Sequence, residues 1–344
     1  MKYEYLLDWY ASNKRTLPWR NTKDPYMIWL SEIMLQQTQV SVVIPYYNKW
    51  IKTFPTIEKV AKADLDNLLK LWEGLGYYSR CRNFHKAAQY VVTHYKGIIP
   101  RDYDLFIALP GVGEYIASAV MSIAYDQSYP AIDGNLKRVI SRYLGLRKIS
   151  KRNLFRIKKK LNTMIQINPG DINQALMDIG SSICKSTIAK CSICPLNITC
   201  KAASSLDATQ YPEKKKKKSI PTKHFISGYI SYDNYILITK RPSTGLLAGL
   251  WELPMVEYRN NSKLIDVLND YTTKSLGCAV NIINKIGVVK HAYSHYKICI
   301  TLFKCEPKNI NVKNSQWIHL NEIDDFTFSK ANHKLFNSIG IIND

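Results

Sequence analysis

The 344-residue chain has no long uninterrupted apolar segment, so a membrane-spanning helix is not expected. Its N-terminal segment MKYEYLLDWY contains Glu4 and Asp8 and lacks a cleavable apolar run, so it does not read as a secretory signal. Internal repeats are also absent. These absences predict a cytoplasmic protein without a membrane partner.

Acidic residues are scarce relative to basic ones. The chain has 27 Asp and Glu against 48 Lys and Arg, a formal net charge of +21. Such an excess suits a polyanionic partner, which is either nucleic acid or a membrane surface. No helix pairs a Lys-rich face with a Trp- and Phe-rich face, which disfavours the membrane. With 46% hydrophobic and 22% charged residues the chain is globular, and nucleic acid is the favoured partner.

Residues 1–208 are predicted to be helical. Apolar residues recur at i, i+3, i+4 and i+7 in the segments 28–40, 57–72, 83–95 and 136–144. A basic linker is expected over 209–221, where five consecutive lysines lie between two prolines. The lysines either form a solvated connector or face a nucleic acid.

Residues 222–344 are predicted to form a separate α+β domain. Two strand-like segments, 224–232 and 235–241, flank Asp233 and Asn234, which suit a tight turn. A third strand-like segment covers 295–305, and residues 264–276 have a helical pattern. The chain should therefore consist of a mainly α N-terminal half and an α+β C-terminal domain.

Four of the eight cysteines fall in one short window with the spacing C-x6-C-x2-C-x5-C: Cys184, Cys191, Cys194 and Cys200. Clustered thiols in a cytosolic chain are more often metal ligands than disulfides. Only one pair has the short spacing of a zinc knuckle, so the pattern favours a cubane cluster with four separated iron corners. Zinc remains the alternative.

A glycine-rich turn interrupts the helical segment 105–125. Gly111, Val112 and Gly113 follow Pro110, and two glycines let the backbone approach a partner closely. Their N–H groups and the N-terminus of the next helix can donate to a phosphate oxygen. The alternative is a turn with a structural role alone. In a basic chain this pattern resembles the helix-hairpin-helix motif of DNA-repair enzymes.

Two carboxylates stand out. Glu32 lies beside apolar neighbours at helical spacing, so burial should raise its pKa and keep it protonated, as a general acid requires. Asp133 precedes a basic helix, where it is either an ordinary N-cap or an ionised carboxylate held by N–H donors. Cleavage of a glycosidic bond uses such a pair, in which the pKa of one carboxyl group is raised and the pKa of the other is lowered.

These segments together resemble the MutY-type adenine DNA glycosylases. The resemblance is carried, in order along the chain, by DPYMIWLSEIMLQQTQVSVVIPYY, GLGYYSRCRN, LPGVGEYIASAV, AIDGNLKRVISRY, the four-cysteine window and GLLAGLWELP. It covers nearly the whole chain and is strongest over residues 15–200. It implies a helix-hairpin-helix glycosylase fold with one [4Fe-4S] cluster, a Nudix-like C-terminal domain, and a monomer that acts on double-stranded DNA.

The resemblance implies excision of adenine mispaired with 8-oxoguanine or guanine, after the nucleotide is flipped out of the duplex. It assigns protonation of adenine N7 to Glu32, stabilisation of the sugar cation to Asp133, and positioning of this centre to Asn135 and Tyr115. The family's remaining positions are matched by Leu17, Trp19, Arg20 and Gln174 near the adenine, by Gln37, Thr38, Leu75 and Tyr77 at the duplex, and by Tyr293, Ser294 and His295 in the loop that reads 8-oxoguanine.

Tyr115 bears on the reaction type. Related glycosylase/lyases have a lysine at this position, and its amine forms a Schiff base with the sugar. A phenol cannot, so base removal with little strand cleavage is expected. The C-terminal domain lacks an Arg-Glu-x-x-Glu-Glu run after Gly249, so recognition without pyrophosphatase activity is expected. The family's Phe-Ser-His loop has Tyr293 in place of Phe, which keeps the ring and adds a hydroxyl, so the role of the loop is expected to survive.

Two other functions compete with this interpretation. An endonuclease-III-like glycosylase/lyase is opposed by Tyr115 and by the additional C-terminal domain. A DNA-binding module with a four-cysteine zinc site predicts a colourless protein that releases no adenine. Strand nicking of an abasic duplex would support the first, and an absence of visible absorption would support the second.

Overall fold

The computed structural model describes residues 3–213, 219–259 and 263–341, so the lysine run 214–218 lies outside the described part. The chain divides into two compact units. The first, here called the helical unit, comprises Met1–Lys62 and Asn83–Lys216, and the second, the mixed unit, comprises Ala63–Arg82 and Lys217–Asp344. In the described part no helix is both long and apolar enough to span a membrane.

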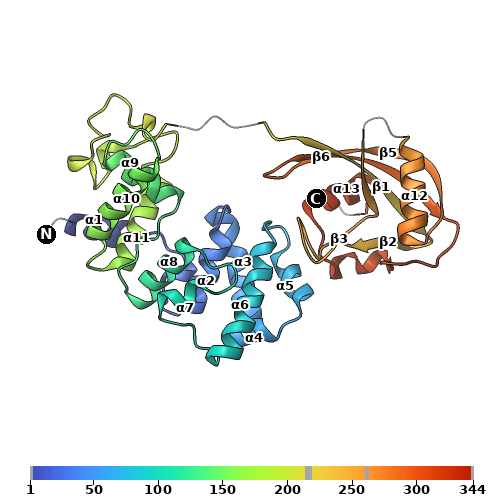
Figure 1. Ribbon diagram of the computed structural model, residues 1–344, viewed down its shortest axis with the longest axis horizontal. Coiled ribbons are helices and arrows are strands. Elements are labelled where there is room, and N and C mark those ends of the chain that lie inside the picture. Colours follow the sequence, from blue (N-terminus) through green and yellow to red (C-terminus); the bar gives the residue numbers. More distant parts are fainter. Residues whose placement is uncertain (1–2, 214–218, 260–262, 342–344) are drawn as a thin grey trace. The chain divides into compact units, whose positions relative to one another are not determined.

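Helices dominate the N-terminal half, as the sequence predicts (Figure 1). Their bounds are α1 Glu4–Asn13, α2 Pro25–Leu35, α3 Val40–Thr53, α4 Ile57–Lys62, α5 Leu65–Trp72, α6 Ser79–Tyr95, α7 Tyr103–Ile107, α8 Glu114–Tyr125, α9 Gly134–Tyr143, α10 Lys151–Met164 and α11 Pro169–Asp178. A short 3-10 turn, η1, covers Pro18–Arg20, and a π-helical turn, η2, covers Ile179–Ile183. Helix α5 belongs to the mixed unit, and α6 begins there.

Two segments that the periodicity predicts as single helices are divided. The segment 28–40 contains the end of α2 and the start of α3, because Gln37 adopts a left-handed φ of 58° that no α-helix continues through. The segment 57–72 contains α4 and α5, because Asp64 caps α5 by accepting a hydrogen bond from the N–H of Asp66 at 3.2 Å. Gln37 and Thr38 therefore lie in an interhelical turn.

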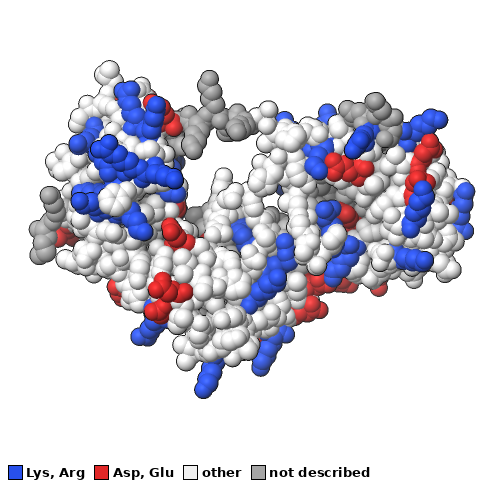
Figure 2. All heavy atoms as spheres, in the orientation of Figure 1, with Lys and Arg blue, Asp and Glu red and all other residues white. Residues whose placement is uncertain are grey.

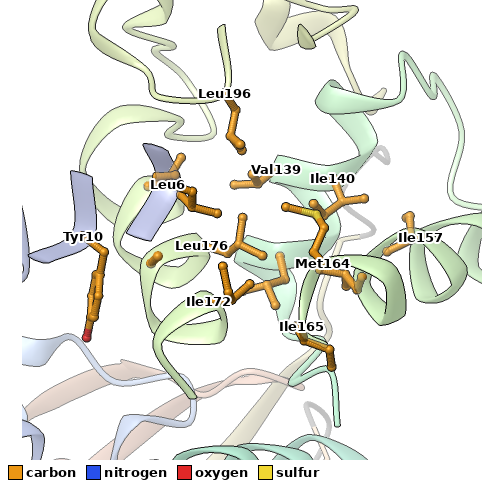
Figure 3. Packing of buried hydrophobic residues seen from close by; sticks show 14 of the residues in the cluster. Leu6, Tyr10, Val139, Ile140, Ile157, Met164, Ile165, Ile172, Leu176 and Leu196 are labelled. Atoms are coloured by element: carbon orange, nitrogen blue, oxygen red, sulfur yellow. The ribbon is translucent and has the colours of Figure 1, made fainter. Parts of the chain in front are cut away.

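One hydrophobic core joins α1, α9, α10 and α11 (Figure 3). Leu6 and Tyr10 of α1 pack with Val139 of α9 and with Ile172 and Leu176 of α11. Burial of each such side chain stabilises the fold by roughly 1.5–3 kcal/mol. This core holds the start of α9 and the length of α11, which both supply residues to the site described below.

The mixed unit contains a seven-stranded sheet with the order β3-β2-β1-β6-β5, to which β4 adds beside β1 and β7 beside β2. The bounds are β1 Thr222–Tyr232, β2 Tyr235–Lys240, β3 Trp251–Glu252, β4 Met255–Tyr258, β5 Val280–Ala292, β6 Lys297–Pro307 and β7 Ser315–His319. Strands β1 and β6 are parallel, and the other pairs are antiparallel. The predicted hairpin at Asp233 and Asn234 is confirmed.

Helices cover both faces of this sheet. Along β1, Ile226 and Ile230 belong to the core that includes α12 (Leu264–Leu276). Phe225 and Tyr229 pack instead with the core that includes α13 (Lys330–Ser338). This alternation is the period of two expected for a strand buried on both faces. The predicted α+β architecture is therefore confirmed.

Candidate active site

A cavity of about 150 Å³ in the helical unit is lined by all four predicted catalytic residues. The predicted residues that line it are Leu17, Trp19, Arg20, Glu32, Thr38, Tyr115, Asp133, Asn135 and Gln174. These come from η1, α2, α8, α9 and α11 and the adjoining turns. The cavity is also lined by residues that the sequence analysis did not single out: Arg15, Ile28, Ser31, Leu35, Val40, Ile123, Met177 and Ser181.

Glu32 is the buried acid of this cavity. It lies in the middle of α2 and only 4% of it is exposed. Burial raises the pKa of Glu32 to about 7, and the negative charge of Asp133 raises it as well. The hydrogen bond from Tyr115 and the positive charge of Arg20 oppose this rise. The carboxyl group is therefore poised to hold or release a proton near neutral pH.

Tyr115 is the direct partner of Glu32. Its phenol, at the start of α8, donates a hydrogen bond of 2.5 Å to Oε2 of Glu32. Burial raises the pKa of the Tyr115 phenol well above its usual value, and the carboxylates of Glu32 and Asp133 raise it further. The phenol thus remains a donor, and it fixes the orientation of the Glu32 carboxyl.

Asp133 is the N-cap of α9, and both of its carboxylate oxygens accept hydrogen bonds. The N–H of Leu136 donates to Oδ1 at 2.7 Å, and the side-chain amide of Asn135 donates to Oδ2 at 2.9 Å. The capping function is therefore real, but the same carboxylate also lines the cavity. The two alternatives weighed from the sequence are thus compatible.

Arg138 supports this carboxylate from one turn further along α9. Its Nη2 donates to Oδ1 of Asn135 at 3.0 Å and to the carbonyl of Gly180 at 2.6 Å, and its Nε donates to the carbonyl of Cys184 at 2.9 Å. A side chain at Gly180 would place its Cβ 2.7 Å from the Cβ of Asn135, so glycine is required there. Asp133 is consequently held by a chain of hydrogen bonds.

Arg15 and Arg20 line another part of the cavity, and both bind a buried carboxylate behind it. Asp178, at the end of α11, accepts hydrogen bonds from the guanidinium groups of both Arg15 and Arg20. Gln174 lies one turn earlier on the same helix and lines the cavity. Sequence analysis identified Arg20 and Gln174 but missed Arg15 and Asp178. The only local signal for Asp178 is its i+4 position relative to Gln174.

The helix-hairpin-helix turn joins α7 to α8, as the sequence predicts. Gly111 has a φ of 77°, and a Cβ on it would lie 2.6 Å from the Cβ of Asn83, so this position requires glycine. The N–H of Val112 donates to the carbonyl of Leu109 at 3.1 Å and closes the turn. Gly113 is the N-cap of α8, and open space surrounds the position of a Cβ there.

The four clustered cysteines line a second cavity together with Arg142. Burial raises the pKa of Cys194 to about 11, and the charges of Cys184, Cys191 and Cys200 raise it further, so the thiols are near one another. Arg142 donates to Sγ of Cys184 at 3.2 Å. No group of three His, Cys, Asp or Glu side chains in the described ranges could hold a single metal ion.

In the mixed unit, Tyr77, which is predicted to contact the duplex, lies against Ser294, which is predicted to contact the lesion. The phenol of Tyr77 and the hydroxyl of Ser294 form a hydrogen bond of 2.6 Å. Tyr77 has a left-handed φ of 49° and is partly exposed, whereas Leu75 is buried. The centroid of the Tyr293 ring lies 5.8 Å from that of Tyr296, and His295 lies between these two residues in the chain.

Comparison with known proteins decides the family. A family model described as the HhH-GPD superfamily of base excision DNA repair proteins matches residues 30–175, and a model described as the NUDIX domain matches residues 227–338. The adenine DNA glycosylase of Buchnera aphidicola subsp. Baizongia pistaciae is 38% identical over 331 residues, covering 94% of this chain and 88% of the relative. The chain belongs to the adenine DNA glycosylase family.

More distant members of this family are also similar. The human adenine DNA glycosylase is 30% identical over 399 residues, which cover 96% of this chain and 72% of the human protein. Among solved structures, a thermostable thymine-DNA glycosylase aligns with a TM-score of 0.54 and 29% identity, covering 58% of this chain and 94% of that one. This chain thus combines a helical glycosylase fold with a Nudix-like domain, and it is an enzyme acting on N-glycosyl bonds.

Proposed function

We propose that this adenine DNA glycosylase hydrolyses the bond between adenine and deoxyribose at A:8-oxoguanine and A:G mispairs in duplex DNA. The observation that carries the proposal is the placement of Glu32 and Asp133 in one cavity, with the pKa of Glu32 raised to about 7. A buried acid and a hydrogen-bonded carboxylate beside it are what cleavage of an N-glycosidic bond uses.

Glu32 acts as the general acid. Tyr115 donates to Oε2 of Glu32, which leaves Oε1 to carry the transferable proton. Transfer of that proton to N7 of the flipped adenine makes the base a better leaving group, because the electrons of the broken C1′–N9 bond are then accepted by a cationic ring. Adenine leaves as the neutral base, and the sugar becomes an oxocarbenium ion.

Asp133 stabilises this sugar cation. Its carboxylate is held by Asn135 and by the N–H of Leu136, so little reorganisation is required when positive charge develops at C1′. Water then adds to C1′ and passes a proton to the carboxylate left on Glu32, which completes the hydrolysis and restores the acid. Tyr115 offers no amine for a Schiff base, so the enzyme removes the base without an associated lyase step.

The remaining predicted residues bind the substrate. Leu17, Trp19, Arg20 and Gln174 surround the adenine in the cavity, and Gln37, Thr38, Leu75 and Tyr77 contact the opened duplex. Tyr293, Ser294 and His295 read 8-oxoguanine from the mixed unit. This division assigns catalysis to residues 1–208, a linker to 209–221 and lesion recognition to 222–344.

Gly111, Val112 and Gly113 shape the hairpin turn that receives a DNA phosphate, with Gly113 at the N-terminus of α8. Exposed basic residues on α10, including Lys151, Arg152 and Arg156, add to the positive surface. Figure 2 shows Lys and Arg side chains gathered over the region of α10 in the helical unit. This charge supports a polyanionic partner, which binds with a strong dependence on salt.

Cys184, Cys191, Cys194 and Cys200 are proposed to hold one [4Fe-4S] cluster. The donor set fits, because four thiols surround one cavity. Arg142 donates to the sulfur of Cys184, a contact of the kind that tunes cluster thiolates. Bound there, the cluster would anchor the segment that follows η2. The protein is proposed to act as a monomer, and its cytoplasmic location stays a prediction from the sequence.

A single-turnover assay on A:8-oxoguanine and A:G duplexes, with and without alkaline treatment, tests the function. We expect adenine release from both duplexes and strand breaks only after alkali. Breaks without alkali would contradict the assignment of Tyr115 and support a lyase. Iron and sulfide analysis of the purified protein, together with its visible absorption, tests the cluster, and a colourless protein with bound zinc would contradict it.

A further inference from the structure

Asp178 is a buried carboxylate that the mechanism above does not use. It ends α11, one helical turn after Gln174, and is 1% exposed. Burial of a charge at such a position is costly unless charged partners compensate for it. Its partners are the two arginines of the cavity wall, which reach it from the segment between α1 and α2.

Asp178, Arg15 and Arg20 form a cluster, here called the clamp, in which each arginine contacts the carboxylate through two nitrogen atoms. Arg20 donates through Nη1 to Oδ2 of Asp178 at 2.5 Å and through Nη2 to Oδ1 at 2.8 Å. Arg15 donates through Nε to Oδ1 at 2.7 Å, and its Nη2 lies 2.6 Å from the same oxygen. Two-point contacts of this kind fix the plane and direction of a guanidinium group. Arg20 is further held over the ring of Tyr10, at 5.6 Å from its centroid.

We propose that Asp178 is a positioning residue: its carboxylate fixes Arg15 and Arg20 in the cavity wall and screens their positive charge from Glu32. The inference rests on the role proposed above for Glu32. It concerns a residue that touches neither adenine nor the sugar and acts through the two arginines.

The proposed screening by Asp178 depends on the polar and charged groups that face Glu32. Tyr115 faces it from α8, Asp133 from the N-cap of α9, and Arg20 from η1, while α3 contributes only the apolar Val40 to the cavity. The positive charge of Arg20 lowers the pKa of Glu32. Two guanidinium cations and one carboxylate leave a single net positive charge in the clamp. Loss of the Asp178 charge would double it, and the protonated form of Glu32 would become less favourable.

The experiment compares pH–rate profiles of single-turnover adenine release in the full-length, cluster-loaded protein. The substitution Asp178→Asn should move the high-pH loss of activity to lower pH, by less than about 1 unit. Asp178→Glu keeps the charge and should restore the wild-type position even if the rate is lower. Asp8→Asn removes an exposed charge from α1 of the same unit and should leave the profile unchanged.

A second variant should shift the pH–rate profile in the opposite direction. Arg15→Gln removes one positive charge from the clamp and should move the high-pH loss of activity upward, by about 0.3 unit, because Arg15 is partly exposed. The double variant with Asp178→Asn restores the net charge and should return the profile towards the wild type. If Asp178→Asn does not fold, the direction of the Arg15→Gln shift still decides, and no shift or a downward shift overturns the proposal.

Infrared titration of the protonated Glu32 carboxyl, assigned by its disappearance in Glu32→Gln, gives a readout independent of turnover. The band should be lost at lower pH in Asp178→Asn than in the wild type. An Asp178→Asn protein whose rate falls equally at every pH, with an unshifted band, would show a structural role alone and overturn the proposal. Full turnover in Glu32→Gln would instead contradict the role of Glu32.

Discussion

Two glutamates, the buried Glu32 of the helical unit and the partly buried Glu73 of the mixed unit, have pKa values that are shifted in opposite directions. Burial raises the pKa of Glu32 in the helical unit to about 7. Burial also acts to raise the pKa of Glu73 in the mixed unit, but hydrogen bonds from His333, Lys70 and the N–H of Phe328 outweigh it, and the pKa is lowered. The comparison shows that the number and charge of the hydrogen-bond donors around a buried carboxyl group decide whether it can hold a proton near neutral pH or stays ionised.

The donors differ in kind. Glu32 receives a hydrogen bond from the neutral phenol of Tyr115, which supplies no positive charge. Glu73 lies 2.7 Å from the ammonium group of Lys70 and 2.9 Å from Nε2 of His333, and it accepts the N–H of Phe328 at 2.8 Å. The ionised form of Glu73 therefore joins α5 to the segment before α13, whereas Glu32 remains able to give up a proton.

The largest effect is expected from Glu32→Gln. Gln keeps the shape and can accept the hydrogen bond of Tyr115, but it has no proton to transfer, so adenine release should fall by about 10³-fold. Single-turnover kinetics on an A:8-oxoguanine duplex measures this. Binding of the duplex, followed by gel shift, should be retained, and unchanged turnover would exclude Glu32 as the acid.

The pH dependence of the wild type is the next largest effect. Because the acid must be protonated and the pKa of Glu32 is about 7, adenine release should decrease as the pH rises through 7. The decrease should approach about tenfold for each further pH unit. A rate that stays constant from pH 6 to pH 9 in a single-turnover profile would contradict this assignment.

Glu73→Gln should destabilise the protein by about 2 kcal/mol at neutral pH, since it leaves the ammonium group of Lys70 and the donors of His333 and Phe328 without their anion. A lowered pKa in the folded state contributes stability that is present above the unfolded value of 4.5 and lost as the pH falls through the folded value. The difference from wild type, measured by denaturant unfolding, should therefore vanish in acid. The exposed pair Asp270 and Lys274 supplies the control, because Asp270→Asn should change stability by less than about 0.5 kcal/mol.

The stability of the helical unit should show the opposite pH dependence, through Glu32. A raised pKa in the folded state contributes stability that is present below the unfolded value and lost as the pH rises through about 7. Glu32→Gln should therefore be more stable than the wild type by about 3 kcal/mol at pH 8, and this gain should fall to less than about 1 kcal/mol at pH 5. Thermal unfolding at the two pH values checks this, and equal stabilities at pH 8 would refute it.

Local patterns predicted much of the fold. Apolar periodicity placed the helices of the first half, and the strands on either side of Asp233 and Asn234 were found with their turn. The breaks at Gln37 and Asp64 were missed, because a residue's left-handed φ or its use as a cap depends on how the next helix packs. Grouping of Ala63–Arg82 with the C-terminal part was also not visible from the sequence.

The candidate site was predictable to the extent that its residues have local signals. Apolar neighbours pointed to Glu32, and the start of a basic helix pointed to Asp133. Asp178 had no comparable signal, because its partners Arg15 and Arg20 lie 163 and 158 residues away along the chain.

The sequence by itself determined the kinds of groups available: a carboxylate within an apolar stripe, an N-cap, a glycine turn and four spaced thiols. These follow from helical and turn geometry over a few residues. Only the tertiary structure decided which of these groups share a cavity, how far burial raises the pKa of Glu32, and which cations Asp178 holds. Those properties depend on dielectric and distance between segments remote in the chain, which packing alone sets.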